Sequence, residues 1–200
     1  MNITTDQIKK LREETGVSVM QCRKALEESD GDIEKAKIML YKISKQSADK
    51  KSDRTLGSGT IASYIHGNGG VGVIVELLCE TDFVARNDDF KALARDIAMH
   101  VAAMAPEYTK IEDVKEEDKV KAKELFEKEV ADLPTQARKP KEIRDKIIEG
   151  KLSAYFGEKV LLDQAFIKNP EVTVQGLIEQ ATQKFGERTA IGRFARFSIN

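Results

Sequence analysis

The sequence has 200 residues, 40% of them hydrophobic, which suits one large domain or one medium domain with a small additional one. Its 33 basic and 34 acidic side chains nearly cancel, which argues against DNA, RNA or an anionic membrane as the main partner and favours a protein. We find no signal-peptide pattern and no apolar run of membrane-spanning length, so we expect a cytoplasmic protein in which Cys22 and Cys79 are free thiols in the core.

Residues 1–44 are predicted to form three short helices, close to the lower size limit for an independently folding unit. Thr4 or Thr5 can cap the first helix, and Gly16 can end it. The segment Ser18-Val-Met-Gln21 fits the capping-box pattern and therefore starts a second helix. A third follows the turn at residues 30–32. We expect the last two helices to bury Val19, Cys22, Ala25, Leu26, Ile33, Ala36, Leu40 and Ile43.

Residues 45–58 are polar and are expected to form a linker, which tethers the three-helix unit to a larger domain at residues 59–200. That domain begins with two predicted strands, at residues 60–66 and 71–79, which a glycine-rich turn joins into an antiparallel hairpin. An unbroken helical stripe follows, with Asn87 as its cap.

Three further helices and a last strand complete the predicted domain. One amphipathic helix is expected between Pro106 and Pro140, a second over residues 143–156, and a third after Thr173, which can cap it. Residues 191–199 alternate as a strand, with a disturbance near Gly192, and can supply the third strand of the sheet. We therefore predict an α+β fold, with helices on one face of a three-stranded antiparallel sheet.

The apolar strand at residues 71–79 stops at a polar corner that carries one large aromatic side chain. The corner consists of Thr81, Asp82, Phe83 and Val84. An aromatic ring between a strand and a helix either completes the local core or contacts another molecule. The residues alone leave both alternatives open.

The sequence offers little for catalysis or metal binding. Its two histidines and two cysteines show no zinc or redox spacing, and the glycines of residues 67–72 join two strands instead of opening a helix, so they form no nucleotide-binding loop. His66 stands beside a turn with no nucleophile or carboxylate pair near it in the sequence. The segment Arg193-Phe-Ala-Arg-Phe197 can in principle stack on single-stranded RNA, but its alternation is more typical of a half-buried strand.

Several segments, taken in order, resemble the elongation factor Ts family of bacteria. The resemblance covers the whole chain, and its most specific element is the Thr-Asp-Phe-Val tetrapeptide after an apolar strand. The matching segments are Ile8-Lys-Lys-Leu-Arg-Glu-Glu-Thr-Gly16, Met20-Gln-Cys-Arg-Lys-Ala-Leu26, Asp30-Gly-Asp-Ile33, Glu80-Thr-Asp-Phe-Val-Ala-Arg86, Leu161-Leu-Asp-Gln-Ala-Phe-Ile167 and Arg193-Phe-Ala-Arg-Phe197.

The resemblance implies a guanine-nucleotide exchange factor for elongation factor Tu, the GTPase that delivers aminoacyl-tRNA to the ribosome. The amino-terminal helices resemble a ubiquitin-associated-type domain that docks on the GTPase, with Arg12 and Met20 as candidate contacts. Asp82 and Phe83 are expected to press between helices of the GTPase and disturb its Mg²⁺ and phosphate site, with Thr81 and Val84 shaping the corner. Such a protein is not an enzyme and needs no cofactor or metal.

The sequence also departs from the family pattern. Val19 replaces the first of a usual methionine pair, and residues 40–44 differ from the usual basic, glycine-ended close of the third helix. At 200 residues the chain resembles short members that lack a second core subdomain and act as homodimers, which implies a 2:2 complex with the GTPase. The alternative function is a noncatalytic adaptor or RNA-binding chaperone, and the near-zero net charge argues against RNA.

Overall fold

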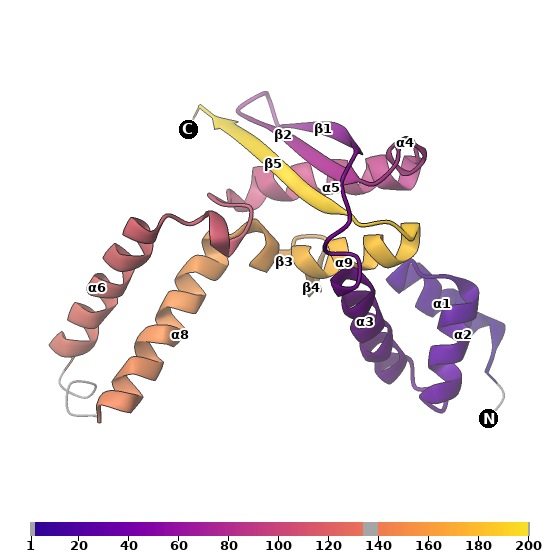
Figure 1. Cartoon of the computed structure of the whole chain (residues 1–200), viewed down its shortest axis with the longest axis horizontal. Helices are drawn as coiled ribbons and strands as arrows, with labels where there is room; N and C mark the ends of the chain where they lie inside the picture. Colours follow the sequence, from indigo (N-terminus) through magenta and orange to yellow (C-terminus); the bar gives the residue numbers. More distant parts are fainter. Residues whose placement is uncertain (1–2, 134–139, 200) are drawn as a thin grey trace.

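A three-stranded antiparallel sheet lies at the centre of the computed structural model, which describes residues 3–133 and 140–199 (Figure 1). Its strands are β1 (Ser58–His66), β2 (Val71–Cys79) and β5 (Ala190–Ser198), in the order β1-β2-β5. Gly67 and Gly69 adopt positive φ angles of 57° and 88° in the turn that folds β2 back on β1. The predicted hairpin and third strand are confirmed, and the register of β2 against β5 shifts near Gly192, where the alternation is disturbed.

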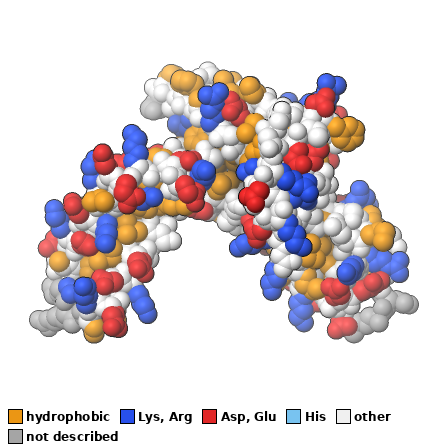
Figure 2. Space-filling view, in the orientation of Figure 1, with side chains coloured by type: hydrophobic (Ala, Val, Ile, Leu, Met, Phe, Trp, Pro, Cys, Tyr) orange, Lys and Arg blue, Asp and Glu red, His pale blue; other side chains and the backbone are white. Residues whose placement is uncertain are grey.

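The two faces of the sheet differ in what covers them. The inner face of β2 carries Val73, Val75, Leu77 and Cys79, all buried, and packs against α5 (Asp88–Met104). α9 (Val174–Phe185) adds buried side chains to the same core, so the helices lie on one face, as predicted. On the outer face large apolar side chains stay exposed, and Figure 2 shows hydrophobic side chains at the end of the sheet where β5 and the β1–β2 turn lie. This outer face includes Ile61, Ile65, Ile74 and Phe197.

The amino-terminal unit has the three predicted helices, α1 (Thr5–Thr15), α2 (Val19–Glu28) and α3 (Ile33–Asp49). Thr4 and Ser18 each form a capping box, and Gly16 ends α1 at a φ of 68°. Their small core contains Leu11, Val17, Cys22, Ala25, Leu26, Ala36 and Leu40.

Two predictions of burial in this unit are wrong. Val19 is 48% exposed and Ile43 is 41% exposed. Val19 is the first residue of α2, directly after its cap, and the helix turns it to solvent while Cys22 faces the core. Near the end of α3 the buried position is Ser44, because this part of the helix faces α9.

α3 continues past residue 44 and joins the three-helix unit to the rest of the chain. Residues 45–49, expected to lie in a linker, are helical, and α3 packs along α9. The hydroxyl of Ser44, which is 1% exposed, hydrogen-bonds to Gln183 Oε1 on α9. The division into residues 1–44, 45–58 and 59–200 stays a prediction, but α3 bridges the first two of these segments.

A helical hairpin projects from the other end of the core. It is formed by α6 (Glu116–Asp132) and α8 (Lys141–Lys159). The hairpin and the three-helix unit extend in the same general direction from opposite ends of the central domain, so the molecule has the outline of an arch (Figure 1). Charged side chains of both signs cover it (Figure 2). Short elements complete the described chain: α4 (Asp82–Ala85), η1 (Ile111–Asp113), η2 (Leu161–Asp163), β3 (Ala165–Phe166) and β4 (Asn169–Thr173).

The later helices agree with the sequence. α6 and α8 lie where the charged and apolar-striped segments predicted them, and Thr173 caps α9 by accepting a hydrogen bond from the Gly176 amide, 3.1 Å away. The short β3–β4 hairpin was not predicted, because its strands of two and five residues carry too few alternating positions for a strand pattern. None of the described helices has the length and apolar character needed to cross a membrane.

Candidate functional site

The corner after β2 presents Phe83 to solvent. Its side chain is 82% exposed, whereas the next two residues, Val84 and Ala85, are 5% and 8% exposed and belong to the core between sheet and helices. All three lie on α4, a single helical turn. The alternative that Phe83 completes the local core is therefore excluded, and the ring is free to contact another molecule.

The local sequence explains why the ring points outward. β2 ends at Cys79, which is fully buried, and the Cys79 thiol donates to the carbonyl oxygen of Thr81 at 3.2 Å. The same oxygen accepts the Ala85 amide at 3.2 Å, which closes the turn of α4. Asn87 then caps α5 by accepting the Asp89 amide at 2.8 Å. A buried strand end and a capped helix thus hold the one-turn helix between them.

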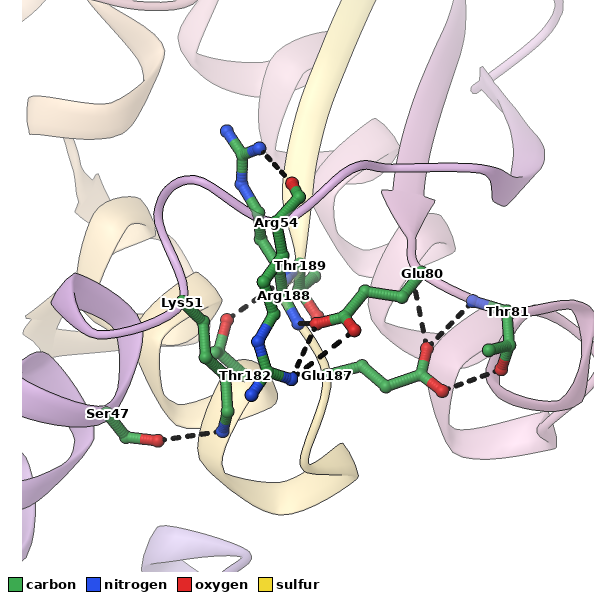
Figure 3. A network of polar contacts seen from close by, with 9 residues as sticks. All are labelled: Ser47, Lys51, Arg54, Glu80, Thr81, Thr182, Glu187, Arg188 and Thr189. Atoms are coloured by element: carbon green, nitrogen blue, oxygen red, sulfur yellow. Dashed lines mark hydrogen bonds and ion pairs between the residues drawn. The ribbon is translucent and has the colours of Figure 1, made fainter.

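A network of polar contacts joins this corner to the loop between α9 and β5 (Figure 3). Glu187 accepts hydrogen bonds from the amides of Glu80 and Thr81, at 3.2 and 3.0 Å, and from the Thr81 hydroxyl at 2.6 Å. In return the Glu80 carboxylate accepts the Arg188 amide at 2.6 Å and pairs with the Arg54 guanidinium at 3.2 Å. The two segments are therefore bound to each other in both directions.

These contacts also set the ionisation of Glu80. The hydrogen bond from the Arg188 amide, helped by the Arg54 guanidinium, holds the pKa of the Glu80 carboxyl below its ordinary value of 4.5. The charged form is the one that accepts the Arg188 and Arg54 hydrogen bonds, so the network is strongest when Glu80 is ionised.

Asp82 stands beside Phe83 and is also open to solvent. Its carboxylate pairs with Arg86 one turn later, at 3.0 Å, with the two side chains 70% and 81% exposed. An ion pair this exposed contributes roughly 0–1 kcal/mol, so Asp82 is free to change partners at little cost.

The candidate residues of the three-helix unit lie on its surface. Arg12 is exposed on α1, and Met20, at the start of α2, is 81% exposed. Val19 beside it is exposed as well, so α2 begins with two uncovered apolar side chains. The structure therefore leaves both Arg12 and Met20 open to a partner, in a part of the molecule separate from the Phe83 corner.

Nothing in the described ranges, 3–133 and 140–199, groups three or more side chains of the kinds that hold a metal ion. His66 is exposed and lies 3.2 Å from the Tyr64 hydroxyl. His100 is fully buried, with Nε2 at 2.9 Å from Gln164 Oε1 and Nδ1 accepting the Ile167 amide, and burial lowers its pKa. His66 is thus a surface residue beside Tyr64, and His100 is a hydrogen-bonded residue of the core.

The arginine-aromatic segment of β5 is engaged within the protein. Arg193 pairs with Glu76 at 2.8 Å, and the Arg196 guanidinium donates to the Ala102 carbonyl oxygen at 3.3 Å. Phe194 is partly buried against the core, and only Phe197 is well exposed. These contacts are those of a half-buried strand, and they count against an RNA-stacking surface.

Sequence reasoning found the corner but missed the residues that hold it. Glu187, Arg188 and Arg54 reach it from segments more than a hundred and about thirty positions away in the chain. The only local signal is the polar run that follows Gly186, between a helix and a strand, and such runs are ordinary in loops.

Comparisons with known proteins point to one family. The family model described as "Elongation factor TS" matches residues 48–200. A protein named elongation factor Ts from Heliobacterium modesticaldum is 46% identical over 98% of this chain and 90% of its own length. Those from Coprothermobacter proteolyticus and Thermotoga neapolitana are each 45% identical over 100% of this chain, and over 99% and 98% of their own lengths. The chain belongs to the elongation factor Ts family.

Proposed function

We propose that this protein is a guanine-nucleotide exchange factor for elongation factor Tu. It releases GDP by pressing Phe83, with Asp82 beside it, between helices of the GTPase and so disturbing the Mg²⁺ and phosphate site. The observation that carries the proposal is the 82% exposure of Phe83 on a one-turn helix whose next two residues are buried. Membership of a family named for a translation elongation factor supports it.

The physics of the nucleotide site makes a single ring sufficient. Mg²⁺ needs a nearly ideal octahedral shell at roughly 2.0–2.1 Å, so a small displacement of the surrounding helices weakens its hold on GDP. Burying a phenylalanine side chain gains about 1.5–3 kcal/mol and requires no hydrogen bonds from the partner. Phe83 therefore acts by binding, without a covalent step or a cofactor.

Exchange also requires that the factor and the nucleotide weaken each other's binding. This effect is reciprocal, so a factor that loosens GDP is itself displaced when GTP binds. The factor favours neither nucleotide, and the direction of exchange comes from the excess of GTP over GDP in the cytoplasm, where we place its action.

The three-helix unit supplies a second contact in this proposal. Met20 and Arg12, exposed on α2 and α1, dock on the nucleotide-binding domain of the GTPase. α3 is fixed to α9 by the Ser44–Gln183 hydrogen bond, so the docking surface and the Phe83 corner are held at a set distance. Docking then brings Phe83 to one place on the partner.

The proposed active form is a homodimer that binds two GTPase molecules. Support comes from the outer face of the sheet, where Ile61, Ile65, Ile74 and Phe197 are 48–70% exposed. Stacked sheets pack about 10 Å apart through such faces. We propose that a second copy of this chain, placed face to face, covers these side chains.

The test is release of a fluorescent GDP analogue from purified elongation factor Tu. Native protein is expected to accelerate release, and Phe83→Ala to lose most of the acceleration while keeping the fold, as judged by circular dichroism. Leu125→Ala, which truncates a 60% exposed apolar side chain on α6, is the matched control and is expected to act as the native protein does. Full acceleration by Phe83→Ala would refute the proposed role of the ring.

A further inference from the structure

The loop between α9 and β5 is fixed at both ends before it reaches the Phe83 corner. Gly186 ends α9 in the left-handed region, at a φ of 72°, and the Thr189 amide donates to the Thr182 hydroxyl at 3.1 Å inside the core. Glu187 lies between these two points. Its carboxylate therefore starts from a backbone that α9 and β5 already hold in place.

The carboxylate of Glu187 accepts three hydrogen bonds from Glu80 and Thr81, at the start of the corner. One oxygen, Oε2, accepts the amides of Glu80 and Thr81, and the other, Oε1, accepts the Thr81 hydroxyl at 2.6 Å. Hydrogen bonds to an ionised acceptor are roughly twice as strong as neutral ones. Three of them on two consecutive residues fix both the position and the rotation of the backbone there.

Thr81 occupies the cap position of α4, yet its side chain makes no capping hydrogen bond to the helix. Threonine at this position ordinarily bonds to the second or third amide of its own helix. Here the Thr81 hydroxyl donates to Glu187 instead. Thr81 is bonded to the helix through its backbone, because its carbonyl oxygen accepts the Ala85 amide. Thr81 is the point at which the contacts of Glu187 meet the backbone of the one-turn helix, so Glu187 reaches Phe83 through Thr81.

The reverse contact makes the arrangement stiff. The Glu80 carboxylate accepts the Arg188 amide at 2.6 Å, so each segment gives a carboxylate to the other's backbone. Figure 3 shows both carboxylates between the two segments. Rotation of the corner would break bonds in both directions at once.

We infer that Glu187 is a positioning residue for nucleotide exchange: it fixes Thr81 so that α4 holds Phe83 at the angle needed to enter the GTPase. This inference rests on the proposed function and deepens it. In this inference Glu187 makes no contact with the partner, because both of its carboxylate oxygens are engaged by Glu80 and Thr81. Its loss should therefore slow the release step within the complex and leave the strength of docking unchanged.

The experiment measures release of a fluorescent GDP analogue from elongation factor Tu at increasing concentrations of full-length factor. Glu187→Gln keeps the size of the side chain but removes its charge, and its single amide oxygen cannot replace both carboxylate oxygens that accept the two backbone amides and the Thr81 hydroxyl. Its maximal release rate is expected to fall on the order of tenfold, because a small misplacement of the Phe83 ring weakens its action on the GTPase. The half-saturating concentration is expected to stay within about twofold, since binding energy is unaffected. Glu107→Gln, which removes an ion pair with Lys159 away from the corner, is the matched control and is expected to behave as native.

The same substitution made in Phe83→Ala protein tests whether Glu187 acts through Phe83. In Phe83→Ala protein, adding Glu187→Gln should change the maximal rate by less than about twofold, because the two residues act on one step. Equal losses in both backgrounds would overturn the inference and assign Glu187 a role apart from Phe83. A native maximal rate in Glu187→Gln, with Phe83→Ala impaired, would overturn the inference alone. A fully active Phe83→Ala would instead refute the proposed function and the inference with it.

Amide hydrogen exchange gives a test that does not depend on release. Exchange at Glu80 and Thr81 is expected to rise in Glu187→Gln and in Glu187→Asp, whose side chain is one methylene shorter, and to stay unchanged in Glu107→Gln. Unchanged protection in both Glu187 variants would show that the carboxylate does not hold the corner, and would overturn the inference.

Discussion

Phe83 and Phe90 lie on consecutive helices, α4 and α5, and have opposite environments: the first ring is 82% exposed and the second is fully buried. The Phe90 ring packs edge-on against Phe185 with the centroids 5.5 Å apart. The chain thus places one aromatic in the core and offers the other to a partner within a few residues.

Truncating these two rings should separate stability from function. Phe83→Ala is expected to change the free energy of unfolding by less than about 0.5 kcal/mol, because an exposed side chain contributes little. Phe90→Ala is expected to cost about 3–5 kcal/mol, since it leaves a cavity in the core. Urea unfolding followed by circular dichroism measures both. A loss above about 1 kcal/mol for Phe83→Ala would mean that the ring is part of the core in solution.

Met20 tests the docking contact of the three-helix unit. Met20→Ala is expected to raise the half-saturating concentration for GDP release on the order of tenfold, as loss of a central interface side chain does. The maximal release rate should stay unchanged, because the Phe83 corner is intact. Met104→Ala, a 46% exposed methionine at the end of α5, is the control and should leave both values as in the native protein. A lower maximal rate in Met20→Ala would contradict a role in docking alone.

Substitutions on the outer face of the sheet test the proposed homodimer. Ile61→Lys with Ile74→Lys places two charges on neighbouring strands of this face and is expected to convert the dimer to a monomer, because burying an unpaired charge is costly. Light scattering coupled to size-exclusion chromatography measures the mass. Ile143→Lys, on α8 of the helical hairpin and 45% exposed, should leave the mass unchanged. A native protein that runs as a monomer would refute the dimer directly.

The lowered pKa of the Glu80 carboxyl predicts that the stability of the protein depends on pH. Its pKa is lower in the folded protein than the ordinary 4.5, so the folded state binds this proton less tightly than the unfolded chain does. The stabilisation is therefore present above about pH 4.5 and is lost as the pH falls through the folded pKa. The difference in unfolding free energy between native protein and Glu80→Gln should shrink as the pH is lowered below 4.5. A difference that does not vary with pH would exclude an ionised Glu80 in the network.

Local patterns in the sequence predicted most of the elements, because their causes are local. The capping boxes at Thr4 and Ser18, the glycine turn between β1 and β2, and the cap at Thr173 each depend on residues within a few positions of one another. The exposure of Phe83 was different. The residues left two alternatives open, and only the resemblance to a family favoured the exposed one.

Contacts between distant segments could not be predicted from the sequence. The polar segment after residue 44 resembled a linker because its partner surface lies on α9, and the Ser44–Gln183 hydrogen bond joins residues 139 positions apart. Val19 has the composition of a core residue, but its place directly after a cap turns it to solvent. Glu187 could not be singled out, since the short polar run after Gly186 that contains it is ordinary for a loop.

The burial of Val84 and Ala85 has a consequence for the manner of encounter with a partner. The backbone that carries Phe83 cannot turn inward unless these two neighbours leave the core. The position of the ring on the surface is thus set before any collision, and association spends little entropy on ordering the backbone there. In the proposed mechanism, the conformational change therefore takes place in the GTPase and not at the Phe83 corner.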